Sequence, residues 1–149
     1  MVVDASVACK WILPEDGSPH ARQVLTAVAD GTWDALAPDI LLAEIANVIW
    51  KKRYLQHELT ADEAAVALAM AYATAPRLAP CHALVDQASH LAAALETAVY
   101  DCLYLALALA HQPAVLVTAD RNFVRRASPV FPDQVRLLAD FAAGLSDGS

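Results

Sequence analysis

AVLVTAD, at residues 114–120, predicts a buried strand that ends beside an acidic residue. The run AVLVT is apolar and contains β-branched residues, a pattern typical of a central strand in a parallel sheet. Asp120 follows this strand, and Asp4 similarly follows the short apolar start MVV. Ligands of open parallel sheets bind beyond the carboxyl ends of the strands. We therefore expect Asp4 and Asp120 to lie at the ligand-binding edge of a sheet.

Helical and strand patterns alternate along the rest of the chain. Two further short strands are expected at 34–37 and 135–137. Apolar periodicity and capping signals predict helices at about 6–13, 19–31, 38–54, 60–75, 84–96, 99–111 and 121–126, and a last helix that ends near 144. The alternation predicts the α/β class, a three-layer sandwich whose mainly parallel central sheet is flanked by helices. We expect one domain over 1–144 and a frayed tail over 145–149.

Composition limits the class of protein. The hydrophobic fraction of 58% is high, but much of it is alanine, and the longest apolar stretches fall short of the roughly 18 residues that span a membrane. No export signal precedes the first strand, so we expect a cytoplasmic protein without membrane contact. The net charge of -7 argues against a broad basic surface for nucleic acid, although short basic strips remain compatible with it.

Several enzyme classes lack their motifs in this sequence. The three cysteines include no CxxC pair, which argues against a disulfide framework and against a zinc cage. The five histidines are scattered without ligand spacing. Because GxSxG, P-loop and GxGxxG motifs are all missing, serine hydrolases, nucleotide kinases and dinucleotide-dependent enzymes are not indicated.

Two more acids lie on apolar faces of predicted helices. Glu44, in LLAEIANVIW, has largely apolar neighbours three and four residues away. Asp101, in AVYDCLYLALALA, lies in the first turn of another helix, on a face that includes Tyr104. A carboxylate resists burial unless a positive group meets it. Folding could therefore bring these two acids and the two strand-end acids to one site that needs a cation.

Repulsion within such a cluster favours a bound metal. Two carboxylates about 4 Å apart repel by roughly 4 kcal/mol at an effective dielectric constant near 20, so either protons or a cation must relieve them. Oxygen ligands suit Mg²⁺ or Mn²⁺, and Mg²⁺ commonly retains several waters. The sequence therefore predicts a Mg²⁺ or Mn²⁺ site formed by Asp4, Glu44, Asp101 and Asp120.

Each acid also has an ordinary structural explanation. Asp120 could cap the helix that follows it, and Asp4 could end the first strand through an Asx turn. Asp101 would gain from the helix dipole, and Glu44 could pair with Lys51 or with an arginine elsewhere in the chain. These separate explanations stay open, whereas a single metal site accounts for all four acids together.

Four motifs give the chain a family resemblance. VVDASVACKWILPE, LLAEIANVIW, YDCLYLALA and VLVTADRNF occur in this order across almost the whole chain. The ordered set DxS, ExxN, YDxxYxALA and TxD resembles the PIN domain of VapC-type toxins. The resemblance implies a PIN-like fold and an endoribonuclease toxin of a type II toxin–antitoxin system that hydrolyses RNA phosphodiesters through a metal-activated water. It also implies a Mg²⁺ or Mn²⁺ cofactor, a homodimer, and inhibition by a cognate antitoxin protein.

The resemblance assigns roles to individual residues. The metal-binding and catalytic acids that it implies are Asp4, Glu44, Asp101 and Asp120. Ser6 and Thr118 match hydroxyl positions of the family motifs.

Other polar residues could assist these acids. Asn47 could orient a ligand carboxylate or touch the scissile phosphate, and local capping is its alternative. Arg121 and Arg125 could hold substrate phosphates, and plain surface exposure is the alternative for each of them. The cations at 51–53 end a helix, where the helix dipole favours them regardless of function, so we predict no binding patch there.

Two competing functions remain. A catalytically weak PIN-fold dimer that only binds a partner would be expected to lack one or more of the acids, and none is missing here. A metal-dependent phosphatase for small molecules ranks below it, because the sequence contains no compact glycine-rich phosphate loop.

Overall fold

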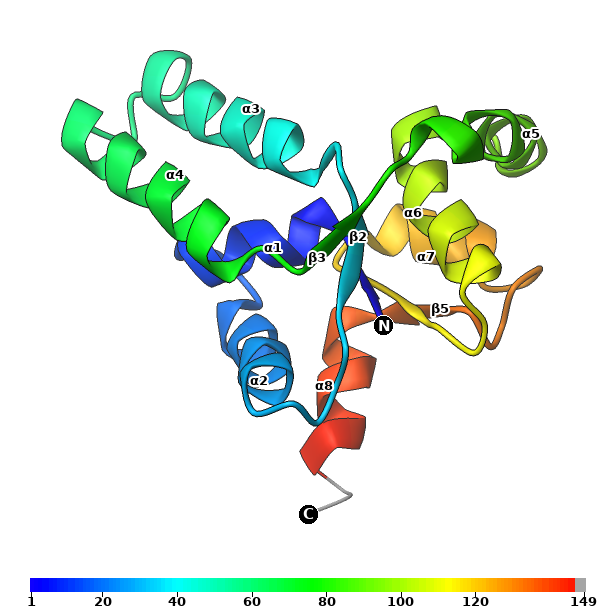
Figure 1. Ribbon diagram of the computed structural model, residues 1–149. Helices are drawn as coiled ribbons and strands as arrows, with labels where there is room; N and C mark the ends of the chain where they lie inside the picture. Colours follow the sequence, from blue (N-terminus) through cyan, green and yellow to red (C-terminus); the bar gives the residue numbers. More distant parts are fainter. Residues whose placement is uncertain (147–149) are drawn as a thin grey trace.

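A computed structural model describes residues 1–146 as a parallel sheet between layers of helices (Figure 1). The sheet has the strand order β3-β2-β1-β4-β5, and every neighbouring pair is parallel. The strands are β1 (Val2–Val3), β2 (Leu36–Pro38), β3 (Arg77–Ala79), β4 (Leu116–Thr118) and β5 (Val135–Leu137). The predicted α/β sandwich is therefore confirmed, and the described sheet is wholly parallel.

The sequence does not predict β3, and that part of the prediction was wrong. Its three residues lie between Pro76 and Pro80 and include no β-branched or aromatic side chain. β3 exists because it pairs residue for residue with β2 at the edge of the sheet, where flanking prolines remove no hydrogen bond from a central ladder. Tertiary pairing overrides local preference here.

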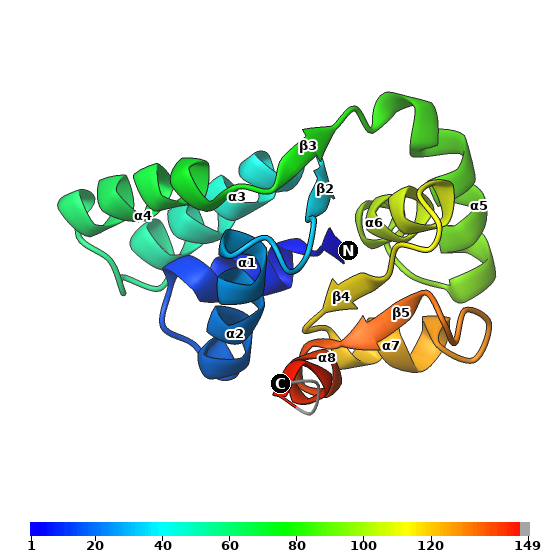
Figure 2. The same ribbon diagram turned by 60° about the horizontal axis from the view of Figure 1, so that its bottom comes forward.

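Helices cover both faces of the sheet (Figure 2). In chain order they are α1 (Ala5–Ile12), α2 (Ser18–Ala29), α3 (Leu41–Tyr54), α4 (Ala61–Thr74), the single 3₁₀ turn η1 (His82–Leu84), α5 (Val85–Leu95), α6 (Val99–Ala110), α7 (Arg121–Ala127) and α8 (Leu138–Ser146). α6 packs against β1, β2 and β4 and in turn carries α5, while α1, α2 and α8 lie on the opposite side. α3 and α4 form a hairpin that projects from the sheet beside α1.

Local signals explain several helix ends. Thr60 and Glu63 form the expected capping box at the start of α4, with each side chain bonded to the other residue's backbone N–H. α5 ends where Glu96 takes a left-handed conformation with φ of 50°, at the break expected before α6. α8 continues to Ser146, two residues beyond its expected end, and residues 147–149 of the expected tail lie outside the described residues.

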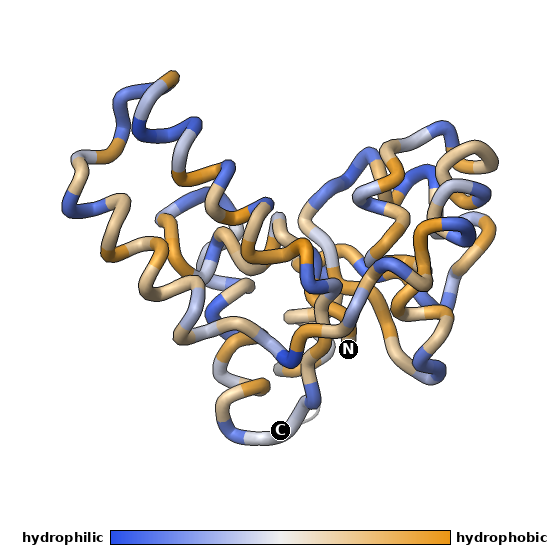
Figure 3. Tube along the Cα trace, turned by 45° about the horizontal axis from the view of Figure 1, so that its top comes forward, coloured by the Kyte–Doolittle hydropathy of each residue, from blue (hydrophilic) through white to orange (hydrophobic). Residues whose placement is uncertain are grey.

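The buried hydrophobic residues form one core cluster between the layers. Figure 3 shows how hydrophobic and hydrophilic residues are distributed along the chain. Both residues of β1 are fully buried, as is Val117 in β4. Within residues 1–146 no single helix is long and apolar enough to cross a membrane; the segments His82–Leu95 and Val99–Ala110 meet the length and composition test only as a pair bent by 115°.

The strand order creates a switch point in the middle of the sheet. β2 and β3 lie on one side of β1, and β4 and β5 lie on the other. The connections that leave β1 towards β2 and β4 towards β5 therefore diverge, which opens a crevice beyond the carboxyl ends of β1 and β4.

Candidate metal centre

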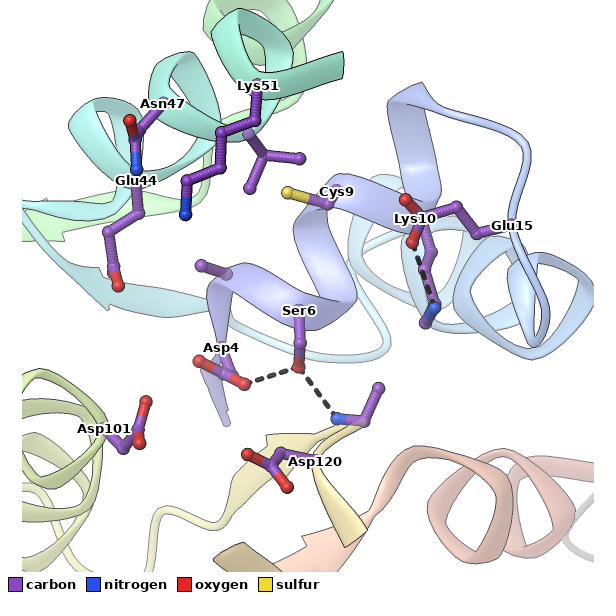
Figure 4. A pocket seen from close by; sticks show the side chains of 13 residues that line it. Asp4, Ser6, Cys9, Lys10, Glu15, Glu44, Asn47, Lys51, Asp101 and Asp120 are labelled. Atoms are coloured by element: carbon purple, nitrogen blue, oxygen red, sulfur yellow. Dashed lines mark hydrogen bonds and ion pairs between the residues drawn. The ribbon is translucent and has the colours of Figure 1, made fainter. Parts of the chain in front are cut away.

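An open pocket of about 470 Å³ lies beyond the carboxyl ends of β1 and β4 (Figure 4). The four predicted acids all line it, and they come from four separate parts of the fold. Asp4 follows β1, Glu44 is on α3, Asp101 is on α6 and Asp120 precedes α7. The structure thus brings together acids that are up to 116 positions apart in the chain.

Two hydroxyl groups hold the carboxylate of Asp4. Ser6 Oγ and Thr118 Oγ1 both donate to Asp4 Oδ2, at 2.5 and 2.6 Å. Ser6 Oγ also accepts the backbone N–H of Ala119 at 2.9 Å, which ties the start of α1 to the end of β4. Burial raises the pKa of Asp4, and the two hydroxyl groups partly offset that rise. The proposed Asx turn is not the main use of this side chain.

A buried phenol meets Glu44 from across the site. Tyr104 on α6 donates its hydroxyl to Glu44 Oε2, and the Tyr104 side chain is only 1% exposed. Burial raises the pKa of Glu44, the bond from Tyr104 opposes this, and the charges of Asp4 and Asp101 raise the pKa further. Among the ion pairs of the described residues none joins Glu44 to Lys51, so the alternative of a local salt bridge is not observed.

Asp101 has the strongest sign of electrostatic crowding. Burial first, and then the charges of Asp4 and Asp120, raise the pKa of Asp101 from 3.8 to about 6. The Thr97 hydroxyl donates to Asp101 Oδ2 at a long 3.4 Å, which only weakly counters the rise. The position of Asp101 in the first turn of α6 does not compensate for this repulsion.

Asp120 both caps α7 and lines the acidic pocket. Its Oδ1 accepts the backbone N–H groups of Asn122 and Phe123 at 2.7 and 3.0 Å, so it is the N-cap of α7. Both bonds use the same oxygen, and the side chain still lines the pocket. Capping and membership of the acidic cluster are therefore compatible.

The four acids have the chemistry of a divalent-cation site, but they do not surround a single ion. Their oxygen donors and their mutually raised pKa values are what a hard cation would relieve. Within residues 1–146, however, no three acidic, histidine or cysteine side chains stand close enough to enclose one ion. An ion such as Mg²⁺, which uses one or two carboxylates directly and keeps its waters, fits this open arrangement.

The expected auxiliary residues divide between the pocket and its surroundings. Ser6 and Asn47 line the acidic pocket, and the Thr118 hydroxyl donates a hydrogen bond to Asp4 Oδ2. The Asn47 amide takes part in none of the hydrogen bonds seen among the described residues, so local capping does not account for it. Arg121 lines a neighbouring pocket instead, where its side chain is exposed.

Sequence reasoning missed two residues of the site. Lys51, dismissed as a helix-end cation, reaches into the acidic pocket from α3 (Figure 4). Its spacing of seven from Glu44, two helical turns on the same face, was the available signal. Tyr104 was noted only as an apolar neighbour of Asp101, and no local pattern identifies Glu44 as its partner 60 residues away.

Comparisons with known proteins agree with this architecture. A crystal structure of PAE2754 from Pyrobaculum aerophilum superposes with a TM-score of 0.69 over 98% of this chain and 96% of that chain, at 19% sequence identity. At that identity the similarity concerns the fold alone. A search of curated protein sequences finds no match. The family model for the PIN domain matches residues 1–129, and the chain therefore belongs to the PIN domain family.

Proposed function

We propose that this protein is a metal-dependent endoribonuclease that acts as the toxin of a type II toxin–antitoxin system. PIN domains are typically metal-dependent nucleases, which makes nuclease chemistry the first expectation for this chain. The observation that supports it most is the convergence of four acids from distant segments on one open pocket, with the pKa of Asp101 raised to about 6. A merely structural cluster would be expected to contain a compensating cation for each acid.

Asp4, Glu44, Asp101 and Asp120 are the residues that would hold Mg²⁺ or Mn²⁺. A bound ion of this kind supplies a water of lowered pKa and stabilises the negative charge that builds up on a phosphate during hydrolysis. The chain contributes the fixed orientation of Asp4, whose Oδ2 accepts hydrogen bonds from Ser6 and Thr118.

Two side chains at the rim suit contact with the substrate. Lys51 and Asn47 lie on α3 one turn apart and both line the acidic pocket. The ammonium of Lys51 forms none of the ion pairs seen in the described residues, so it is free to neutralise a phosphate oxygen. Direct hydrolysis that does not use the ribose 2′-hydroxyl leaves a 5′-phosphate and a 3′-hydroxyl.

RNA cleavage with purified protein tests this function. The wild type should cut RNA with Mg²⁺ or Mn²⁺ and stop in excess chelator, and the matched variants Asp101→Asn and Asp86→Asn should differ. Both residues lie in the first turn of a helix, but Asp86 is exposed and lies outside the pocket. Loss of cutting in Asp101→Asn alone supports the proposal. Cleavage that survives Asp101→Asn, or products that end in a 2′,3′-cyclic phosphate, would contradict it.

The toxin role has its own test in cells. Expression of the wild type alone should arrest bacterial growth, and Asp4→Asn should restore it. Normal growth despite soluble, RNA-cutting protein would remove the toxin assignment while leaving the nuclease assignment intact.

The second candidate function is partner binding without cleavage, and one feature of the surface favours it. The α3–α4 hairpin exposes several large apolar side chains, namely Trp50, Tyr54, Leu55, Val66, Met70 and Tyr72. Large apolar side chains that stay exposed on neighbouring helices are candidates for protein contacts. Under either function, we propose that a second copy of this chain and the cognate antitoxin are its protein partners. Light scattering of purified protein tests the dimer, and a monomer at micromolar concentration would contradict it.

A further inference from the structure

We propose that a second pocket, beside the acidic one, binds the RNA phosphate group next to the scissile phosphate. This subsite rests on the proposed ribonuclease function and extends it to how the substrate strand is held. The second pocket has a volume of about 450 Å³ and is lined by Lys10, His20 and Arg121 among other residues. It lies between the segment that precedes α2 and the starts of α7 and α8.

The two pockets adjoin each other. Lys10 and Ala119 line both of them, so a chain that leaves the acidic pocket across Ala119 enters the second pocket. Ala119 is also held in place, because its backbone N–H donates to Ser6 Oγ at 2.9 Å. The boundary between the two pockets is thus built on the same contacts that orient Asp4.

Acids predominate in the first pocket and cations in the second. Five acids face two lysines in the first pocket, and the acids are Asp4, Glu15, Glu44, Asp101 and Asp120. In the second pocket Asp16 is the lining acid, and it faces the two cations Arg121 and Lys10. Cations therefore gather next to the acidic site, where a second phosphate of the same strand would otherwise be repelled.

Arg121 is the residue most available for that phosphate. Its side chain is exposed, and its guanidinium takes part in none of the hydrogen bonds or ion pairs seen among the described residues. Lys10 is partly neutralised by Glu15 at 3.2 Å. A free guanidinium presents a fork of N–H donors that matches two phosphate oxygens.

The lining points to phosphate rather than base recognition. Apart from His20 no aromatic side chain of the described residues lines the second pocket, and glycine, leucine and alanine form the rest of its wall beyond the charged groups. Base binding without sequence preference commonly depends on aromatic stacking, which is scarce here. The subsite should therefore strengthen RNA binding to a similar degree for all sequences.

A pair of arginines on α7 provides the test. Arg121→Gln and Arg125→Gln remove the same charge from the same helix, but Arg125 bonds Asn122 at 3.3 Å and does not line the second pocket. Both variants are compared with the wild type on one RNA oligomer and on copies in which a neutral methylphosphonate replaces a single phosphate near the cleavage site.

We expect the substitution of Arg121 and the neutralised phosphate to remove the same contact. Arg121→Gln should lower kcat/KM roughly tenfold on the unmodified oligomer, as should one methylphosphonate position in the wild type, because each removes one charge-assisted contact. In Arg121→Gln that same methylphosphonate should cost little more, whereas in Arg125→Gln it should cost the full factor. Equal effects of the two substitutions, or losses that multiply in Arg121→Gln, would overturn the subsite.

A binding measurement separates this inference from the proposed function. If the wild type cuts no RNA, the ribonuclease proposal fails, and the same oligomers are then followed by fluorescence anisotropy. The pattern expected for kcat/KM should then appear in Kd. Indistinguishable Kd values for Arg121→Gln and Arg125→Gln would overturn the subsite regardless of cleavage.

Discussion

Replacing Asp101 by asparagine should stabilise the metal-free protein at neutral pH. Burial and the charges of Asp4 and Asp120 raise the pKa of Asp101 from 3.8 to about 6. A rise of this size corresponds to about 3 kcal/mol against the ionised folded state. Because the side chain is partly exposed, solvent screening lowers the effect to about 1–2 kcal/mol. For a chain of this size that gain raises Tm by about 3–6 °C.

The stabilisation expected from Asp101→Asn depends on pH. Between about pH 4 and pH 6 the folded protein binds more protons at Asp101 than the unfolded chain does, so stability falls as the pH rises through this window. At about pH 7 the carboxyl group is almost fully ionised in the folded protein, and above that pH the penalty is complete and constant. Asp101→Asn should remove this contribution, and its advantage over the wild type should therefore shrink towards zero near pH 4.

Thermal unfolding in EDTA, followed by circular dichroism from pH 4.5 to pH 8, measures the effect. Asp86→Asn is the matched control, since Asp86 also lies in the first turn of its helix but is exposed and outside the cluster. It should give no gain in Tm. A loss of stability in Asp101→Asn at pH 7.5, or a gain that does not vary with pH, would refute the reasoning from crowded carboxylates.

Three further predictions follow from the same site. Mg²⁺ at about 100 times its Kd should stabilise the wild type by about 2.7 kcal/mol and Asp101→Asn by much less, and equal increases in Tm would exclude binding through Asp101. Tyr104→Phe should lower the free energy of unfolding in urea by about 1–3 kcal/mol, because Glu44 loses its donor inside the fold, whereas Tyr72→Phe, at a residue that is 65% exposed, should leave it unchanged. Thr118→Val should weaken Mg²⁺ binding in calorimetry, because Asp4 Oδ2 keeps only the Ser6 donor; an unchanged Kd would show that Thr118 does not orient the ligand.

Local patterns in the chain anticipate much of this molecule. The apolar run before Asp120 becomes β4, the Thr60–Glu63 pair caps α4, and the break at Glu96 separates α5 from α6. These features depend on neighbours within a few residues, so periodicity and capping chemistry suffice to predict them. Glu44 and Asp101 are also recognisable from the local sequence, because a carboxylate on an apolar helix face is costly to bury without a partner.

Contacts between distant segments lie beyond such patterns. β3 has no strand signal of its own and forms through its register with β2. The bond from Tyr104 to Glu44 depends on how α6 crosses α3, and the reach of Lys51 into the acidic pocket depends on where α3 projects from the sheet. The free energies of burial and of strand pairing depend on residues that are distant in the sequence. Patterns within a short stretch of sequence therefore do not predict them.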